Sequence, residues 1–258
     1  MLLHFYKYQG TGNDFVIVDN REGTIQLTKE QVALLCNRHF GIGADGLMLL
    51  NKNPNYDFEM VYYNADGALG SMCGNGGRCL TRFAFDQGIK PTTYTFIASD
   101  GEHEAVIDNN GWVHLKMIDI HAVSYENEAT VLNTGSPHYV KQVSNIDSFD
   151  VFENGKSIRY NDVYNENGIN VNFVELKNNE LFVRTYERGV ENETFSCGTG
   201  VTAAAIAMSS DNIGEQEIKI KTLGGHLLIR FNKIDPQHFN HVWLCGPATF
   251  IYEGQITI

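Results

Sequence analysis

Alternating apolar and polar residues predict that most of the first half of the chain is β-strand. Residues 2–19 fit a strand, a glycine-rich turn and a second strand. Residues 47–50 and 58–63 are short apolar runs separated by turn-forming residues, which predicts two further strands. From residue 94 to 120 the alternation continues, as in a meander of antiparallel strands.

Helical patterns interrupt these strands at three places. Thr28 and Gln31 fit a capping box that opens a short amphipathic helix. A second helix follows the glycines after Cys73 and stops at Gly88, and a third, rich in alanine, covers residues 201–208. Strands and helices together predict a mixed fold of the α/β (α+β) class.

The second half of the chain repeats the first at a fixed spacing, since 197 minus 73 and 182 minus 58 both give 124. Aligning residues 58–76 with 182–200 needs no gap and superimposes five identical pairs: Phe58 and Phe182, Tyr62 and Tyr186, Cys73 and Cys197, Gly74 and Gly198, Gly76 and Gly200. In each copy a strand leads through a polar loop to Cys-Gly-x-Gly and a helix. The repeat predicts two pseudo-symmetric domains, residues 1–120 joined by a last strand at 248–258, and residues 121–247.

Composition and charge narrow the possible functions. Hydrophobic residues make up 43% and charged residues 19% of the 258 residues, as in an ordinary globular protein. The net charge of −12 disfavours nucleic acid and anionic lipid as partners. No segment has the unbroken apolar length of a spanning helix, so we expect no membrane association and a cytoplasmic location.

The cysteines are too few and too scattered for a disulfide framework. There are five of them, and none forms a Cys-x-x-Cys pair, so we also expect no metal site built mainly from thiolates. A single cysteine is more often a small buried apolar residue than a reactive one. We interpret Cys36, Cys79 and Cys245 in that way.

Cys73 and Cys197 differ because each precedes glycines at the start of a helix. Unpaired backbone N–H groups and the positive end of the helix dipole favour a thiolate there, and glycines let a carboxylate approach the backbone. If two such domains face each other across a cleft, the two sulfurs lie on opposite sides of one bound carboxylate. One sulfur can then remove an α-hydrogen while the other returns a proton from behind. The helix starts would stabilise the carbanion without a pyridoxal cofactor.

Polar and glycine-rich motifs occur in a specific order along the whole chain. They are Gly12-Asn13-Asp14-Phe15, Arg38-His39 with Gly41-Ile42-Gly43, Asn64-Ala65-Asp66-Gly67, Cys73-Gly74-Asn75-Gly76-Gly77-Arg78, Pro137-His138, Asn170-Val171-Asn172-Phe173, Tyr186-Glu187-Arg188-Gly189, Cys197-Gly198-Thr199-Gly200 and Gly246-Pro247-Ala248. In order and spacing they resemble the diaminopimelate epimerases, which convert LL-diaminopimelate to the meso form.

The resemblance implies a fold of two domains, each a curved, mostly antiparallel sheet wrapped around a central helix, with the active site in the cleft between them. It also implies a reaction free of pyridoxal phosphate and of metal, in lysine and peptidoglycan-precursor synthesis. Similar enzymes are usually homodimers.

The resemblance also assigns roles to individual residues. Cys73 and Cys197 would be the acid/base pair. Backbone N–H groups would bind the carboxylate at the reacting centre, from Gly74, Asn75, Gly198 and Thr199. Four side chains would hold the polar ends of the substrate, namely Asn13, Asn64, Asn170 and Arg188, with Arg188 on the distal carboxylate. Glu187 and His138 would assist near the sulfurs, and Glu187 would also receive an ammonium group.

Three positions depart from the family pattern and bear on substrate contacts. Ser136 stands where asparagine is common, Ala68 where serine is usual, and Gly46 where some relatives carry a polar residue. Ser136 still offers a hydroxyl, so we expect rearranged contacts to the distal end of the substrate with the chemistry retained.

Other interpretations of these residues stay open. Residues 41–46 match G-x-G-x-x-G, but they follow a predicted helix and precede a strand, the reverse of a dinucleotide site. Asn13 could be a turn residue and His138 a satisfied loop residue. The alternative functions are a proline or hydroxyproline racemase, which uses the same paired-cysteine logic, and a catalytically silent relative that binds an amino acid.

Overall fold

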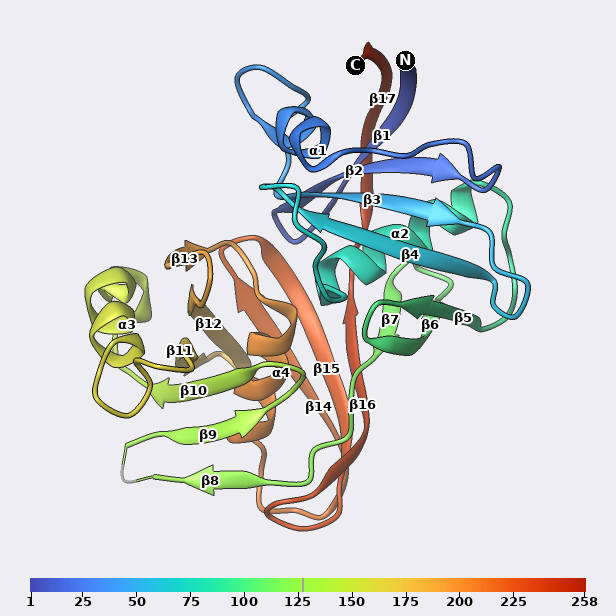
Figure 1. Cartoon of the computed structure of the whole chain (residues 1–258). Helices are drawn as coiled ribbons and strands as arrows, with labels where there is room; N and C mark the ends of the chain where they lie inside the picture. The colour runs from blue at the N-terminus through green and yellow to red at the C-terminus, as the bar shows by residue number, and fades with distance from the viewer. Residues whose placement is uncertain (127) are drawn as a thin grey trace. The chain divides into compact units, whose positions relative to one another are not determined.

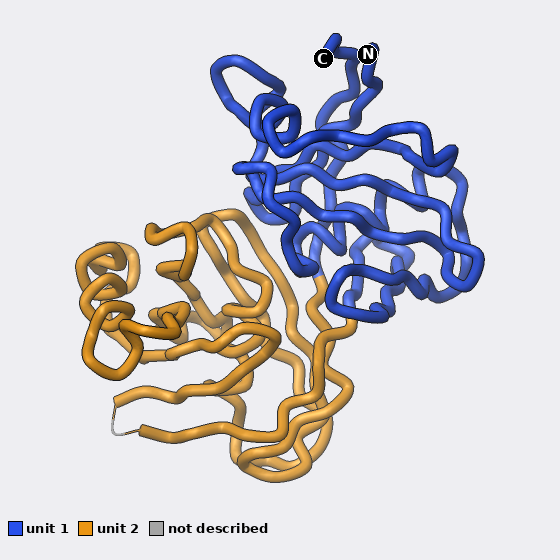
Figure 2. The backbone as a smooth tube through the Cα atoms, in the orientation of Figure 1, with its two compact units in different colours: residues 1–115, 246–258 blue, residues 116–245 orange. Residues whose placement is uncertain are grey.

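The computed structural model describes residues 1–126 and 128–258, whose backbone divides into two compact units (Figure 2). Unit 1 comprises Met1–Leu115 and Gly246–Ile258, and unit 2 comprises Lys116–Cys245. Both units are mostly strand with a few helices, which confirms the mixed class predicted from the hydrophobic pattern. In the described residues, every helix is too short or too polar to cross a membrane.

Unit 1 is a sheet in which the first and last strands of the chain are neighbours. Its strands are β1 (Leu2–Gly10), β2 (Asn13–Asn20), β3 (Gly46–Asn51), β4 (Phe58–Asn64), β5 (Tyr94–Ala98), β6 (Gly101–Ile107), β7 (Val113–Lys116) and β17 (Thr249–Thr257). β1 is antiparallel to both β17 and β2, β2 is parallel to β3, β3 is antiparallel to β4, and β4 is parallel to β5. Figure 1 shows β1 and β17 side by side, and the Met1 amino group donates to the Ile258 carbonyl at 2.5 Å.

Unit 2 repeats this order of strand pairings. Its strands are β8 (Val123–Tyr125), β9 (Thr130–Asn133), β10 (Pro137–Gln142), β11 (Asn170–Lys177), β12 (Glu180–Glu187), β13 (Asn192–Thr194), β14 (Gly214–Thr222), β15 (Gly225–Lys233) and β16 (Phe239–Gly246). β9 is antiparallel to β10, β10 is parallel to β11, β11 is antiparallel to β12, and β12 is parallel to β14. The repeat seen in the sequence therefore extends to the topology of each unit.

One helix lies at the centre of each unit and another lies outside. α2 (Gly74–Asp86) packs against β1, β2, β3, β4 and β6, and α4 (Gly198–Ala207) packs against β9, β10, β11, β12, β14 and β15. Nearly every residue of α4 is buried, as expected for a helix that is apolar all round. α1 (Lys29–Cys36) joins the parallel strands β2 and β3, and α3 (Val151–Arg159) joins β10 and β11.

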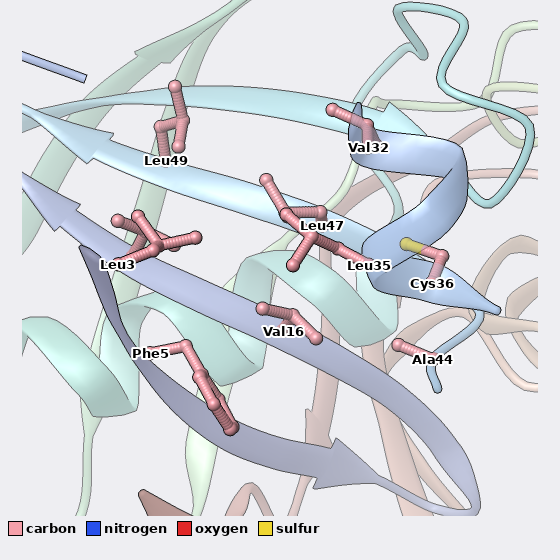
Figure 3. Close-up of a cluster of buried hydrophobic side chains, with 10 residues drawn as sticks. Leu3, Phe5, Val16, Val32, Leu35, Cys36, Ala44, Leu47 and Leu49 are labelled. Atoms are coloured by element: carbon pink, nitrogen blue, oxygen red, sulfur yellow. The ribbon is translucent and has the colours of Figure 1, made fainter. Parts of the chain in front are cut away.

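Strands β2 and β3 are buried on both faces because a helix covers each face. Figure 3 shows Val16 of β2 and Leu47 of β3 packed with Leu35 of α1 in one apolar cluster. On the other face, the Phe15 ring lies 3.5 Å from a Cβ placed on Gly76 of α2. Continuous apolar runs are typical of such doubly covered strands.

The buried cysteines complete the core as predicted. Cys36 packs in the α1 cluster (Figure 3), Cys79 lies in the centre of α2, and Cys245 lies in β16, all shielded from solvent. Burial raises the pKa of the Cys36 thiol to about 11 and that of the Cys79 thiol to about 12. These two thiols are therefore protonated at neutral pH.

The glycines of the G-x-G-x-x-G stretch reverse the chain at the end of α1. A side chain on Gly41 would lie 1.9 Å from the Leu34 carbonyl oxygen, and Gly43 has a positive φ of 81°. The backbone N–H groups of Ile42 and Gly43 donate to the Leu35 carbonyl. The stretch follows a helix and leads into β3, as predicted, so its glycines satisfy a helix C-terminus.

Candidate active site

Cys73 and Cys197 are the N-cap residues of the two central helices. Their φ and ψ angles are −96° and 129° for Cys73 and −116° and 116° for Cys197, both extended. The first N–H groups of each helix follow directly, and these groups have no partner within the helix. Cys73 is partly exposed, whereas Cys197 retains 8% of its exposure. The prediction that both cysteines open a helix is confirmed.

Asn13 and Asn75 lie beside Cys73 in unit 1. The Asn13 side-chain carbonyl accepts hydrogen bonds from the Cys73 thiol at 3.6 Å and from the Asn75 amide at 3.2 Å. The Asn13 amide nitrogen donates to the Asp45 carboxylate at 2.7 Å, and a carboxylate can only accept, so the orientation of Asn13 is fixed. Asn13 begins β2, and the turn residues are Thr11 and Gly12, with φ of 50° and 85°.

A charged network holds Asp45 in place. Arg38 donates to Asp45 at 2.6 Å and to the two oxygens of Asp14 at 2.7 and 3.0 Å, and the Lys7 ammonium lies 2.7 Å from Asp14. Burial alone would raise the pKa of Asp14, but hydrogen bonds from Arg38 and Lys7 outweigh it and hold that pKa well below its ordinary value. Sequence reasoning assigned no role to Arg38 or Asp45, although both lie in motifs that it singled out.

Acid should weaken this network in a predictable direction. Because the pKa of Asp14 is lower in the folded protein than its ordinary value of 3.8, its ionised carboxylate stabilises the fold at pH values above 3.8. This contribution is lost progressively as the pH falls below 3.8. Arg38→Gln should therefore lower the free energy of unfolding by about 1 kcal/mol at pH 7 and by less at pH 3. Urea unfolding at both pH values measures this.

The control is Arg230→Gln, which removes the exposed pair between Arg230 and Glu217 at 2.8 Å. It should cost no more than about 0.5 kcal/mol at pH 7. An equal loss at pH 7 and pH 3 for Arg38→Gln would contradict the assigned role of Asp14.

Unit 2 gathers a second set of predicted residues around Ser136. The Asn170 amide donates to the Ser136 hydroxyl at 2.9 Å and accepts from the Arg188 backbone N–H at 2.9 Å. The Arg188 guanidinium donates to the same Ser136 hydroxyl at 3.3 Å and to the Asn167 carbonyl at 3.0 Å. Arg188 is exposed, whereas Asn170 is buried. The Ser136 hydroxyl thus contacts both the Asn170 and the Arg188 side chains.

Thr199 lies beside the Cys197 sulfur, and hydrogen bonds from two threonines hold Thr199 and Glu187. The Thr199 hydroxyl lies 3.5 Å from the Cys197 sulfur, and the Thr199 carbonyl accepts from the Thr134 hydroxyl at 2.8 Å. The Glu187 carboxylate accepts from the Thr194 hydroxyl at 2.9 Å. Glu187 and Arg188 follow each other at the end of β12, so they leave the sheet at one point.

His138 lies in β10 and is completely buried, so it is not a loop residue. Burial, reinforced by the charge of Arg188, lowers the pKa of His138 to about 3. Its Nδ1 lies 3.0 Å from the Asn172 amide nitrogen, and its Nε2 has no hydrogen-bond partner among the described residues. His138 is therefore neutral at physiological pH.

Asn64 and the two remaining departures lie at one end of β4. Asn64 is exposed, and its backbone N–H donates to the Ala68 carbonyl at 2.9 Å across a turn. Gly46 pairs with Asn64 in the sheet, and a side chain there would lie 2.5 Å from the Tyr62 ring. A polar side chain at position 46 would therefore require Tyr62 to move.

In the described residues no group of three His, Cys, Asp or Glu side chains could hold a metal ion.

The fold recurs in solved structures of low sequence identity. A PhzF-family phenazine biosynthesis protein of Bacillus anthracis matches with a TM-score of 0.76 at 16% identity, covering 100% of both chains. A hydroxyproline epimerase of Agrobacterium vitis matches with a TM-score of 0.68 at 14% identity, covering 99% of this chain and 92% of that one. The chain therefore shares its fold with a PhzF protein and a hydroxyproline epimerase.

Sequence comparison identifies the family among proteins of this fold. The model of the diaminopimelate epimerase family matches residues 5–120 and 130–251 of the chain. Diaminopimelate epimerases of Flavobacterium psychrophilum and Chlorobaculum tepidum are 48% and 42% identical to this chain, covering 98% and 96% of it and 100% and 99% of the relatives. The chain belongs to the diaminopimelate epimerase family of isomerases.

Proposed function

We propose that the chain interconverts LL- and meso-diaminopimelate without a cofactor, using Cys73 and Cys197 as its two acid/base groups. The observation that carries this proposal is that each cysteine is the N-cap residue of the helix at the centre of its unit, with glycines in the first turn. Both sulfurs are therefore next to backbone N–H groups that can bind a carboxylate.

The proton balance requires the two sulfurs to start in different states. One thiolate takes the α-hydrogen and becomes a thiol, which leaves a carbanion at the α-carbon. The other thiol gives its proton to the opposite face and becomes a thiolate, so the configuration is inverted. The reverse reaction exchanges the two roles, and protons exchanged with water reset the pair after each turnover.

The helix starts would lower the energy of the carbanion. Its charge spreads onto the carboxylate, and four backbone N–H groups would bind that carboxylate, those of Gly74, Asn75, Gly198 and Thr199. Prearranged donors of this kind stabilise charge that develops in the transition state. The absence of side chains at two of these positions lets the carboxylate approach the backbone closely.

The polar groups around Ser136 would recognise the distal end of the substrate. The Arg188 guanidinium has five N–H donors and would bind the distal carboxylate, with Asn170 and the Ser136 hydroxyl beside it. Glu187 would receive an ammonium group, while Asn13 and Asn64 would hold the polar groups near Cys73. His138 would assist from its buried position. The homodimeric state, the cytoplasmic location and the role in lysine synthesis stay predictions from the family resemblance.

The test compares diaminopimelate with proline in deuterated water. We expect the protein to introduce deuterium at the α-carbon of LL-diaminopimelate and to form the meso isomer, with no exchange into proline. Proline and hydroxyproline are the alternative substrates because solved neighbours of the same fold include a probable proline racemase and a hydroxyproline epimerase. Exchange into proline alone would favour that alternative, and binding of diaminopimelate without exchange would indicate a silent relative.

A further inference from the structure

A buried chain of hydrogen bonds connects Thr185, Asn172 and His138 in unit 2. The Thr185 hydroxyl donates to the Asn172 side-chain oxygen at 2.9 Å, and the Asn172 amide nitrogen lies 3.0 Å from Nδ1 of His138. Asn172 and His138 are completely buried and Thr185 retains 3% of its exposure. Buried polar groups of this kind are held in one arrangement by their partners.

The orientation of the Asn172 amide follows from a third contact. The Asn172 nitrogen also donates to the Tyr139 backbone carbonyl at 3.1 Å. A carbonyl oxygen can only accept, so the atom facing both Tyr139 and His138 must be the NH₂ group. Its second hydrogen then points to Nδ1 of His138, which must accept and carries no proton.

The position of the remaining ring proton of His138 is thereby determined. The ring is neutral, because burial and the nearby Arg188 charge disfavour the imidazolium. A neutral ring without a proton on Nδ1 carries it on Nε2. That N–H is shielded from water and has no acceptor among the described residues. A buried donor without a partner is costly, and a bound ligand that supplied the acceptor would remove that cost.

This network lies against the first turn of α4. A side chain on Gly200 would be 2.5 Å from the Asn172 oxygen and 3.3 Å from the Cys197 sulfur. Asn172 is thus in contact with the backbone that presents Cys197.

The equivalent positions in unit 1 have different residues. Subtracting the 124-residue spacing from 172 gives Met48. Phe15 takes the place of His138, because Phe15 pairs with Gly46 as His138 pairs with Asn170, 124 residues after Gly46. Met48 likewise lies against the equivalent helix, since its sulfur is 3.2 Å from a side chain placed on Gly76. The fold therefore accepts an apolar residue at this point, and the amide of Asn172 serves a purpose other than packing.

We infer that Asn172 is a positioning residue that fixes His138 as an Nε2–H donor to an anionic acceptor on the substrate. This inference rests on the proposed function for the identity of the substrate. It deepens that function because it makes His138 a hydrogen-bond donor in the reaction and excludes it as the resting base. The Asn172 amide acts only through His138 and contacts no reacting atom.

The first test is the nitrogen-15 spectrum of the histidine side chains in the wild-type protein, with His138→Gln used to assign the signal. We expect His138 to show a protonated Nε2 and an unprotonated Nδ1, unchanged between pH 5 and 8. A protonated Nδ1 in the wild-type protein overturns the inference. This result needs neither turnover nor a stable variant.

The second test reverses the hydrogen bond. The carboxylate of Asn172→Asp accepts where the amide donates, so the ring proton should move to Nδ1. We expect kcat for diaminopimelate to fall by about 10²-fold, as when one donor to a developing charge is lost, with little change in KM. Thr185→Val is the matched control, because it removes a buried hydrogen bond of the same network but leaves the Tyr139 contact to orient Asn172.

The Thr185→Val control distinguishes a role of Asn172 in orienting His138 from a role in stabilising the fold. Thr185→Val should lower stability by about 1 kcal/mol, keep the proton on Nε2 and retain kcat within about threefold. Full kcat in an Asn172→Asp protein whose ring proton has moved overturns the inference while the proposed function stands. Failure of the wild-type protein to epimerise diaminopimelate defeats the proposed function, and the spectrum still decides the tautomer.

Discussion

Replacing either Cys73 or Cys197 with serine should lower the rate of diaminopimelate epimerisation by about 10³-fold or more. A serine hydroxyl fits the same space but is a far weaker acid, and its conjugate base is not populated at neutral pH. Each substitution removes one of two required proton carriers, so the double variant should be little slower than either single variant. Chiral analysis of the product measures epimerisation, and deuterium incorporation at the α-carbon measures the exchange of the α-hydrogen.

The same two serine variants should be at least as stable as the wild-type protein, so a loss of activity in them cannot be explained by unfolding. Neither cysteine side chain makes a capping hydrogen bond, whereas serine is a favoured N-cap residue. We therefore expect Cys73→Ser and Cys197→Ser to unfold no earlier than the wild-type protein. The control is Cys79→Ala in the core of α2, which should lose about 1 kcal/mol of stability and keep its activity. An active Cys197→Ser protein would show that this sulfur carries no proton.

The strands and central helices were predictable because local sequence and tertiary packing agree there. Thr28 and Gln31 form the predicted capping box, and the glycines after each cysteine begin α2 and α4. Strands buried on both faces, such as β3, need continuous apolar runs, and these are visible without a structure. The fixed spacing of 124 residues then indicated that both halves share one topology.

Helix α3 was missed because its contact with the sheet uses a glycine. Among its residues only Val151 and Gly155 are buried, so the apolar face is too sparse to recognise. A side chain on Gly155 would lie 2.4 Å from Cβ of Tyr186, which shows how closely the helix approaches β12. Asp150 does cap the helix by accepting from the Glu153 N–H at 3.0 Å. This cap, with Glu153 in the first turn and Lys156 and Arg159 in the last, was the local signal available.

Side-chain orientation in the site was likewise beyond the sequence. The motif at residues 170–173 drew attention to Asn170, yet the second asparagine, Asn172, contacts His138. In the same way Asp45 orients Asn13 from 32 residues away. Both relationships depend on which strands are neighbours. The parallel pairing of β10 with β11, for example, brings residues 138 and 170 together. A single sequence identifies such groups and leaves their partners undetermined.

Gly200→Ala should be strongly destabilising, whereas the equivalent Gly76→Ala should be tolerated. Alanine favours a helix over glycine by about 1 kcal/mol, which is the same gain at both positions. At Gly200 the new methyl group would lie 2.5 Å from the Asn172 oxygen, and Asn172 is held by three hydrogen bonds. At Gly76 it would meet the Met48 sulfur at 3.2 Å, and a methionine side chain adjusts readily.

Since Asn172 cannot yield without losing its partners, we expect Gly200→Ala to lower the free energy of unfolding by about 2 kcal/mol. Gly76→Ala should stay within about 1 kcal/mol of the wild-type protein. Urea unfolding of the two variants, followed by helical circular dichroism, compares the same substitution at the same turn of two topologically equivalent helices. The activity of Gly200→Ala should also fall, because the displaced amide no longer orients His138. Equal stability of the two variants would mean that the Asn172 network has room to rearrange, and His138 would then not be held in one tautomer.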